Sequence, residues 1–208
     1  MKFIVFVEGF TEQKVVGPFL KRWLDPRVTR RPGIKPVRFD GWREMEKDMA
    51  KKAKMYLQAP SHKDVLGVVA LLDLYGPTFY PGHLRTSEER LGWARKHFEE
   101  EVGDPRFRMF FAVHELEAWL LSDPSIFPRD VGSELSSMAQ MPETIDFDEP
   151  PGKLLARLYR DKMKRTYKKV VHGGSLFARL DPNVAYEKCP ELRRMLDKML
   201  QMAHSAGL

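Results

Sequence analysis

Two continuous apolar runs constrain the fold of this chain more than any other feature of its sequence. Residues 3–7 read FIVFV and residues 65–72 read VLGVVALL. An apolar run without alternation, rich in β-branched and aromatic residues, indicates a strand that is buried on both faces, as in a parallel sheet. Residues 107–113, FRMFFAV, form a third run of this kind. The sequence therefore predicts an α/β fold built on a parallel sheet.

Segments with the apolar spacing of helices separate these strands. The spacing predicts helices over residues 11–24, 42–57 and 88–102. Thr11 and Ser87 are the expected caps of the first and the third helix. A short strand is expected at residues 36–39, between the first two helices. Strands and helices thus alternate along this part of the chain.

The second part of the chain differs in composition. Residues 125–152 contain several prolines and acids and are predicted to form a linker, with at most a short helix near residues 132–138. Two helices are then expected, over residues 153–170 and 190–204. A turn at His172-Gly173-Gly174 is expected to separate them. We therefore predict an α/β domain over residues 1–124 and, over residues 125–208, a linker and helical extension packed on it.

The length and the cysteine content place the chain in a broad class. A chain of 208 residues is long enough to bury a core without disulfides or structural metals. The single cysteine, Cys189, has no partner for a bridge, which favours a reducing, intracellular setting. No apolar run approaches the roughly 20 residues of a membrane span, and Glu8 interrupts the N-terminal apolar run. We expect a soluble cytoplasmic protein without a membrane partner.

The charge distribution indicates a polyanionic partner. The formal net charge is +6 and the isoelectric point is near 9.4. Residues 162–179 contain several lysines and arginines and no acid. Such cations neutralise phosphates, and Tyr167 is placed to stack on a base or ribose. The alternative is a solvated helix face that Tyr167 anchors to the core. The candidate nucleic-acid-binding residues are Lys162, Lys164, Arg165, Tyr167, Lys168, Lys169 and His172.

Acidic residues follow each of the three apolar strands. Glu8 follows the first and Asp73 the second, while Glu115 and Glu117 come after the third. Because the carboxyl ends of parallel strands share one edge of a sheet, these carboxylates can converge. Hard oxygen ligands of this kind bind Mg²⁺ or Mn²⁺. The alternative is ordinary polar capping of strand ends. We predict Glu8, Asp73, Glu115 and Glu117 as metal ligands.

Several neighbouring residues have two interpretations each. Glu12 is either a functional acid, which we include with Glu8 and Asp73 as catalytic candidates, or a first-turn acid favoured by the helix dipole. His114 is interpreted as a hydrogen-bonding neighbour and Cys189 as a structural residue. The sequence has no Walker-type phosphate loop and no GxGxxG motif, which argues against nucleotide hydrolysis or dinucleotide binding.

Three motifs resemble a known family. The first part of the chain resembles the Toprim domain of topoisomerases, primases and OLD-family nucleases. The resemblance lies in the start EGFTE at residues 8–12, in the strand–helix alternation, and in Asp73 after the strand of residues 65–72, which is third when the short strand at 36–39 is counted. A narrower similarity is to an uncharacterised family of bacterial Toprim-like proteins, catalogued as a domain of unknown function. It lies in three motifs: LLDLYG at residues 71–76, HELEAWLLSD at 114–123 and YKKVVHG at 167–173. The Toprim part covers residues 1–123, and the narrower match covers nearly the whole chain.

The resemblance implies a Toprim-like sheet of four parallel strands with Mg²⁺ at its carboxyl edge. It implies that Glu8 acts as acid, base or metal ligand and that Asp73 is a ligand. Toprim domains usually carry Asp-x-Asp after the third strand, whereas this chain has Tyr75 at the second position. Either Glu115 or Glu117 replaces the missing ligand, or metal binding is weak and catalysis is lost.

The expected function is metal-dependent hydrolysis of phosphodiester bonds in DNA or RNA. The resemblance implies in addition a role in bacterial antiphage defence together with a separately encoded ATPase. A homodimer is a further possible assembly. The alternative is a non-catalytic Toprim-like module that serves as a scaffold for an ATPase or a nucleic acid.

Overall fold

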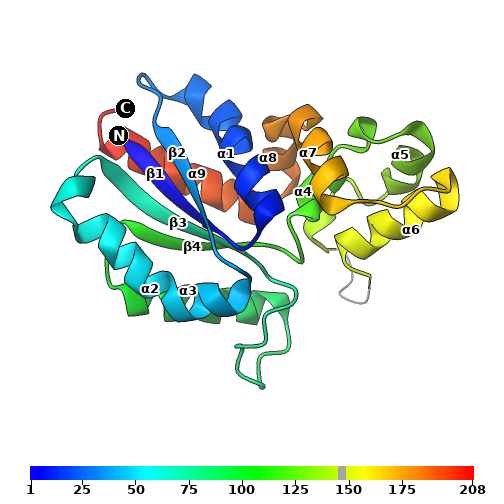
Figure 1. Ribbon diagram of the computed structural model, residues 1–208. Coiled ribbons are helices and arrows are strands. Elements are labelled where there is room, and N and C mark those ends of the chain that lie inside the picture. Colours follow the sequence, from blue (N-terminus) through cyan, green and yellow to red (C-terminus); the bar gives the residue numbers. More distant parts are fainter. Residues whose placement is uncertain (145–148) are drawn as a thin grey trace.

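A single sheet of parallel strands lies at the centre of the molecule (Figure 1). The computed structural model describes residues 1–144 and 149–208. The strand order is β2-β1-β3-β4, so β1 and β3 are central. The strands are β1 (Lys2–Val7), β2 (Gly33–Arg38), β3 (Val65–Asp73) and β4 (Phe107–Ala112). The predicted α/β fold with a parallel sheet is confirmed.

The apolar runs become strands because each buries side chains on both faces. Along β1, Phe3, Val5 and Val7 enter one core cluster. Ile4 and Phe6 enter a second cluster on the opposite face. This division follows from the two-residue period of a strand, whose successive side chains point to opposite faces. β1 from Phe3 to Val7 and β3 from Val65 to Leu72 therefore carry continuous apolar runs instead of an alternating pattern.

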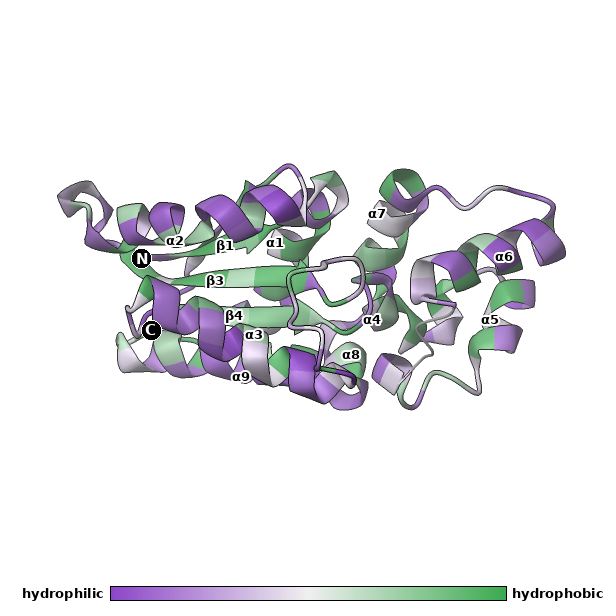
Figure 2. Ribbon diagram, turned by 90° about the horizontal axis from the view of Figure 1, so that it is seen from below, coloured by the Kyte–Doolittle hydropathy of each residue, from purple (hydrophilic) through white to green (hydrophobic). Residues whose placement is uncertain are grey.

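Helices cover both faces of the sheet. Helices α2 (Trp42–Gln58) and α3 (Ser87–Val102) cover one face, and α1 (Phe10–Leu24), α8 (Pro182–Lys188) and α9 (Pro190–Ser205) lie on the other (Figure 1). Figure 2 shows the hydrophobic colour on the strands and much of the hydrophilic colour on the helices around them. Both termini lie at the same end of the sheet (Figure 1).

The remaining helices lie beyond the carboxyl ends of the strands. They are α4 (Glu117–Leu121), α5 (Arg129–Leu135), α6 (Pro151–Met163) and α7 (Lys169–Arg179). Figures 1 and 2 show α5 and α6 as the part farthest from the sheet, with α4 and α7 between. The predicted linker thus contains α5 and two short 3₁₀ turns, and its residues 145–148 lie outside the described residues.

Two predicted helix boundaries in the C-terminal part are wrong. The helix expected over residues 153–170 ends at Met163, because Lys164 adopts the left-handed conformation at φ +54°. Gly173 and Gly174, expected in a turn, lie inside α7. A Cβ on Gly173 would lie 3.6 Å from the methyl carbon of Thr11, so this glycine sits where α7 packs against α1. Packing therefore explains the glycine better than a turn does.

Both predicted helix caps are also wrong. Gly9 is the N-cap of α1, without a side-chain hydrogen bond, and Thr11 lies inside the helix. Thr86 caps α3, and Ser87 is the first helical residue. Thr86 forms a capping box with Glu89, in which each side chain accepts a hydrogen bond from the other residue's backbone N–H. β2 also begins at Gly33, three residues before the predicted strand, and as an edge strand it tolerates Pro36.

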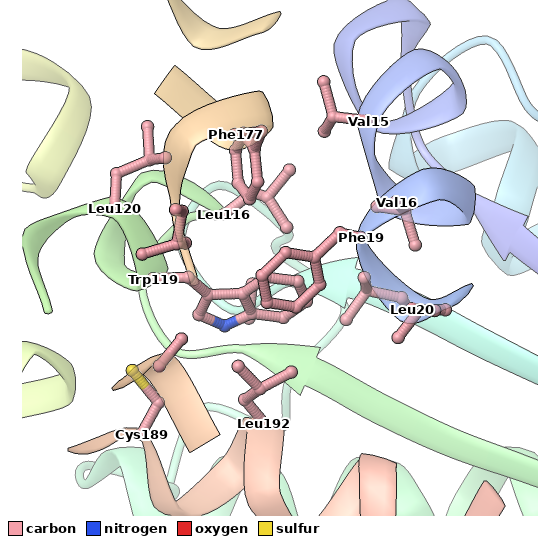
Figure 3. Close-up of a cluster of buried hydrophobic side chains, with 14 of the residues drawn as sticks. Val15, Val16, Phe19, Leu20, Leu116, Trp119, Leu120, Phe177, Cys189 and Leu192 are labelled. Atoms are coloured by element: carbon pink, nitrogen blue, oxygen red, sulfur yellow. The ribbon is translucent and has the colours of Figure 1, made fainter. Parts of the chain in front are cut away.

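One hydrophobic cluster joins the sheet to the C-terminal helices (Figure 3). The indole ring of Trp119 in α4 stacks on Phe19 of α1, with 5.5 Å between ring centroids. Phe177 of α7 packs edge-on against Phe19 at 5.9 Å. Cys189 and Leu192 approach from the opposite side (Figure 3). The proposed domain boundary at residue 124 stays a prediction. Side chains of the C-terminal helices, such as Phe177, contact side chains of the α/β part, such as Phe19. None of the helices in the described parts of the chain is long and apolar enough to cross a membrane.

Candidate active site at the carboxyl edge of the sheet

Acidic residues from three strand ends line or face one cavity. Glu8 follows β1, Asp73 is the last residue of β3, and Glu117 begins α4 after β4. The cavity has a volume of about 450 Å³. Its lining residues are Glu8, Gly9, Phe10, Thr11, Glu12, Arg38, Asp40, Gly41, Asp73, Lys169 and Val170. The structure therefore brings together three predicted catalytic residues, Glu8, Glu12 and Asp73.

The ammonium group of Lys169 lies between the carboxylates of Glu12, Asp73 and Glu117. Its Nζ is 3.0 Å from Glu117 Oε2, 3.6 Å from Glu12 Oε1 and 3.8 Å from Asp73 Oδ2. Burial lowers the pKa of Lys169, but Asp73, Glu117 and Glu12 raise it by more, so the pKa lies above its ordinary value. Lys169 is therefore a permanent cation that neutralises part of the acidic cluster.

Asp73 is fixed in this cluster by its backbone surroundings. Its Oδ1 accepts a hydrogen bond from the backbone N–H of Leu116 at 3.1 Å. Burial raises the pKa of Asp73 well above its ordinary value, Lys169 opposes this rise, and the neighbouring acids add to it. The hydrogen bond ties the end of β3 to the segment after β4, so it positions the carboxylate across two strands.

Glu8 presents an unsatisfied oxygen. Its Oε2 is buried and has no hydrogen-bond partner among the described residues. Burial raises the pKa of Glu8, and repulsion from Glu12 raises it further, against the backbone amides of Trp42 and Asp73. A buried carboxylate oxygen without a partner is unfavourable unless a proton, a cation or a donor satisfies it.

Gly9 allows the carboxylate of Glu12 to fold back over the backbone. A Cβ atom at position 9 would lie 2.7 Å from Glu12 Oε2, closer than such contacts occur. The side chain of Glu12 is only 10% exposed and pairs with Lys169. A first-turn acid that served only the helix dipole would not need this buried, paired position. The geometry thus places Glu12 in one ion-pair cluster with Asp73 and Glu117, and its functional role stays a prediction.

The two glutamates after β4 diverge. Glu117 is the first residue of α4, and its carboxylate meets Lys169. Glu115 Oε2 instead accepts a hydrogen bond from the backbone N–H of Gly152 at 2.7 Å, at the start of α6. His114, just before them, has a left-handed φ of +64°, which turns the chain sharply between β4 and α4. Of the two candidates for the missing ligand, Glu117 faces the acidic cluster.

Tyr75 lies outside the cavity lining. Its hydroxyl group is 3.5 Å from Lys153 Nζ. The ring centroid is 5.8 Å from the same nitrogen. The position that carries the second aspartate in Toprim domains is thus directed toward α6 in this chain.

The predicted nucleic-acid-binding segment is divided by the fold. Lys162 pairs with Glu134 at 2.6 Å, and Lys164 Nζ donates to the carbonyl oxygen of Asp161. Arg165 and Lys168 are exposed, while Lys169 faces the acids.

The aromatic residues of this segment pack inward. Tyr167 is 9% exposed, and its ring stacks on His172 with 5.6 Å between centroids. The His172 Nδ1 atom accepts a hydrogen bond from the backbone N–H of Lys168 at 2.7 Å. This geometry corresponds to the anchoring alternative for Tyr167. Arg165 and Lys168 stay exposed, as do Lys162 and Lys164, which pair with neighbouring groups of the protein.

The sequence does not predict a role in the cavity for Lys169, Phe10 or Arg38, among other lining residues. Lys169 was grouped with the nucleic-acid-binding residues, and nothing in the sequence indicated that it meets Asp73. Phe10 and Arg38 were not selected at all. The only available signal for Phe10 was its position inside the EGFTE motif, between two residues that the sequence already marked as functional.

The donor atoms present are of the kind that a divalent cation binds, since Glu8, Glu12, Asp73 and Glu117 all offer carboxylate oxygens. Glu8 Oε2 is moreover a buried acceptor without a partner among the described residues. Within residues 1–144 and 149–208, no group of three or more histidine, cysteine, aspartate or glutamate side chains is arranged closely enough to hold a metal ion. Lys169 explains the spacing, because the acids surround its ammonium group instead. The residues fit a divalent cation by their chemistry, with Lys169 as the resident positive charge.

The chain is similar to known proteins in its sequence and in its fold. Residues 7–200 match the family model described as "Domain of unknown function (DUF4276)". The structure is similar to the C-terminal region of the Burkholderia pseudomallei OLD protein, with a TM-score of 0.50 and 17% sequence identity. The similarity covers 97% of this chain and 98% of that chain. No curated protein matches the sequence significantly. At this level of identity the structural likeness shows a shared fold alone.

Proposed function

This chain belongs to the DUF4276 family, and from that membership, its Toprim-like fold and its acidic cluster we propose that it is a metal-dependent nuclease that hydrolyses phosphodiester bonds of DNA or RNA. One observation carries the proposal. Carboxylates from three different elements, Glu12 in α1, Asp73 at the end of β3 and Glu117 at the start of α4, meet around a single cation, with distances of 3.0 to 3.8 Å to Lys169 Nζ. Isolated polar caps of strands would not require this convergence.

Each residue has a role that its position supports. Glu8, Asp73 and Glu117 are the proposed ligands of Mg²⁺ or Mn²⁺, and Glu8 is also the proposed general acid or base. A bound divalent cation would lower the pKa of water and stabilise charge on phosphate oxygens. Asp73 is oriented by Leu116 N–H, and Glu12 fixes Lys169 from the side of α1.

Lys169 is suited to contact the substrate as well as the acids. Its side chain is 39% exposed, whereas that of Glu117 is 2% exposed. The ammonium group is therefore accessible from the cavity while the acid beneath it is not. A phosphate group that enters the cavity would meet this cation, which can stabilise the negative charge that develops during hydrolysis. Arg165 and Lys168 are the proposed contacts to more distant phosphates.

The proposed partners extend beyond the substrate. The structurally similar protein is described as the C-terminal region of an OLD protein, so it is part of a longer chain. We propose that a separately encoded ATPase works with this protein, and that the pair acts in antiphage defence. The ATPase and the defence role rest on the family resemblance, and a homodimer stays a proposal of the same kind.

A second candidate function is a non-catalytic scaffold for an ATPase or a nucleic acid. Two observations favour it. Tyr75 replaces an expected ligand and points toward Lys153. Lys169 already neutralises the acids, and no ready-made metal cluster is present in the described parts of the chain.

Cleavage assays distinguish the two candidates. We expect labelled single-stranded and double-stranded oligonucleotides to be cleaved in Mn²⁺ or Mg²⁺ and not in EDTA. Asp73→Asn and Glu8→Gln should each reduce the rate about 100-fold or more, since each removes a group that acts on the reacting phosphate. Asp64→Asn is the matched control, because Asp64 pairs with Lys2 at the opposite end of the sheet. Cleavage that is equal in all three variants would exclude the nuclease assignment, and binding without any cleavage would support the scaffold.

A further inference from the structure

The mouth of the cavity carries an exposed aromatic ring. Phe10 is the first residue of α1, lines the cavity with Glu8 and Asp73, and is 59% exposed. A single exposed apolar residue is common on protein surfaces and needs no explanation by itself. Its position is unusual because the same cavity holds the acidic cluster.

Phe10 shares this mouth with a second exposed apolar residue. Val170, which follows Lys169 in α7, is 50% exposed and also lines the cavity. Among the described residues, six large hydrophobic side chains are exposed, and two of them line this cavity. Exposed apolar side chains that gather beside a polar cavity indicate a binding surface.

A cation covers one side of the Phe10 ring. The guanidinium carbon of Arg38, at the end of β2, lies 3.9 Å from the ring centroid. Arg38 also pairs with Asp40, which holds the guanidinium group in place. Guanidinium groups and aromatic rings both stack on nucleobases, and a guanidinium group in addition binds phosphate. The pair of Phe10 and Arg38 thus offers contacts to a base and to its backbone.

We propose that Phe10, backed by Arg38 and with Val170 in the same cavity lining, is a slot that stacks an unpaired nucleobase beside the phosphodiester held over the acidic cluster. This inference rests on the proposed nuclease function and adds a substrate class to it, namely single-stranded or locally unpaired nucleic acid. A base in a duplex is already stacked and paired, so it must be unstacked before it can enter such a slot. A single strand has no such requirement.

The charges around the slot are consistent with this occupant. The cavity lining contains four acids, Glu8, Glu12, Asp40 and Asp73, and two cations, Arg38 and Lys169. This excess of acid repels a polyanion on its own. We therefore expect oligonucleotide binding to require a divalent cation, while stacking on Phe10 contributes a term that does not depend on charge.

Oligonucleotide binding to the full chain tests the slot. Affinity is measured by fluorescence anisotropy with a single-stranded oligonucleotide and with the duplex of the same sequence. Ca²⁺ replaces Mg²⁺ so that cleavage is suppressed. Phe10→Ala should weaken single-strand binding about tenfold, because the variant loses the stacking of a base on the aromatic ring. Duplex binding should change less than twofold.

Two controls and a spectroscopic readout accompany this variant. Phe10→Tyr keeps a ring and should retain single-strand affinity. Met55→Ala removes another exposed apolar side chain, 50% exposed on α2, and should change nothing. 2-Aminopurine in the oligonucleotide should lose fluorescence on binding to the parent and to Phe10→Tyr, since stacking quenches its emission. It should keep its fluorescence with Phe10→Ala. An unchanged melting temperature of Phe10→Ala shows that the fold is intact.

The outcomes separate the slot from the nuclease function. Equal single-strand affinity of the parent and Phe10→Ala, or equal losses for single strand and duplex, would overturn the slot and leave the nuclease proposal intact. A change of oligomeric state in Phe10→Ala without a change in oligonucleotide affinity would assign Phe10 to a protein interface and overturn the slot. A parent protein that binds neither oligonucleotide would overturn both proposals.

Discussion

Lys169 is the cation that compensates the acids at the carboxyl edge of the sheet. Its ammonium group pairs with the carboxylates of Glu12, Asp73 and Glu117. The side chains of these acids are 10%, 17% and 2% exposed. Carboxylates held this close repel one another unless a cation or protons compensate them. Lys169 therefore stabilises the fold in addition to its proposed contact with substrate.

Replacing Lys169 by an uncharged residue should destabilise the folded protein, because the neighbouring carboxylates then repel one another without compensation. We expect Lys169→Met to lower the free energy of unfolding by about 1–3 kcal/mol at neutral pH, because it leaves buried acids without their partner. The loss should shrink as the pH falls and the acids bind protons, and millimolar Mg²⁺ should restore part of it. Thermal and chemical denaturation with and without Mg²⁺ measure these effects.

The matched control for this variant is Lys168→Met. Lys168 precedes Lys169 in the chain and is exposed, so its replacement should leave the melting temperature nearly unchanged. Equal stability of the two variants at neutral pH would show that Lys169 does not compensate the acids.

At the residue scale the sequence predicted the acids and not their cation. Glu8 and Asp73 were recognisable because each directly follows a buried apolar strand, and the edge of a parallel sheet collects such residues. Lys169 follows no comparable signal. Its place depends on how α7 packs against α1, which is determined by tertiary contacts such as that between Gly173 and Thr11. Tyr167 was ambiguous for the same reason, since its burial depends on that packing.

At the scale of elements, Glu143 caps the start of α9. Its Oε2 accepts a hydrogen bond from the backbone N–H of Glu191 at 2.9 Å. Burial raises the pKa of Glu143 from 4.5 to about 7, against the hydrogen bonds from the backbone N–H groups of α9. Because the folded state holds the proton more tightly than the unfolded state, this residue favours folding most below pH 4.5. Its contribution is lost as the pH rises toward about 7.

Glu143→Gln should remove this pH dependence. A glutamine keeps an oxygen acceptor for the α9 amides and carries no charge at any pH. We expect the free energy of unfolding of the variant, relative to the parent, to increase between pH 4.5 and 7 by at most roughly 3 kcal/mol. Chemical denaturation at pH 4.5, 6 and 8 measures it. Glu187→Gln, at an exposed carboxylate, is the control. The same pH dependence in the parent and in Glu143→Gln would contradict this role.

The elements themselves were predicted unevenly. The apolar strands and the helices α2 and α3 were recognisable from periodicity, which is a local property. The C-terminal part was less so, because Gly173 and Gly174 have the composition of a turn and yet lie in α7. Helix α8 was not expected at all. Short helices of this kind owe their stability to tertiary packing rather than to their own sequence.

At the scale of the whole molecule, one cluster connects the sheet with the C-terminal helices. Trp119 is completely buried, stacks on Phe19 of α1 and packs edge-on against Phe177 of α7, with Cys189 and Leu192 nearby (Figure 3). The acidic cavity needs residues from both parts, since Lys169 begins α7 and Asp73 ends β3. We therefore expect the two predicted parts to fold as one cooperative unit.

Trp119→Ala tests this cooperativity. The variant should lose about 3–5 kcal/mol of unfolding free energy, as expected when a large buried side chain is removed from a packed core. Unfolding followed by far-UV and near-UV circular dichroism should remain a single coincident transition. Trp93→Ala, at a partly exposed tryptophan of α3, should cost less. Two separate transitions in the parent protein would show that the C-terminal helices unfold independently.

The central claim is that the carboxylates at the sheet edge form one cation-binding centre. A crystal structure of the protein with Mn²⁺, with data collected at the manganese absorption edge, tests it most directly. We expect an anomalous peak at roughly 2.1 Å from oxygen atoms of Asp73 and of Glu8 or Glu117, with the Lys169 ammonium group displaced from its present position. No peak in the cavity at millimolar Mn²⁺, with Lys169 still paired to Glu117, would contradict it.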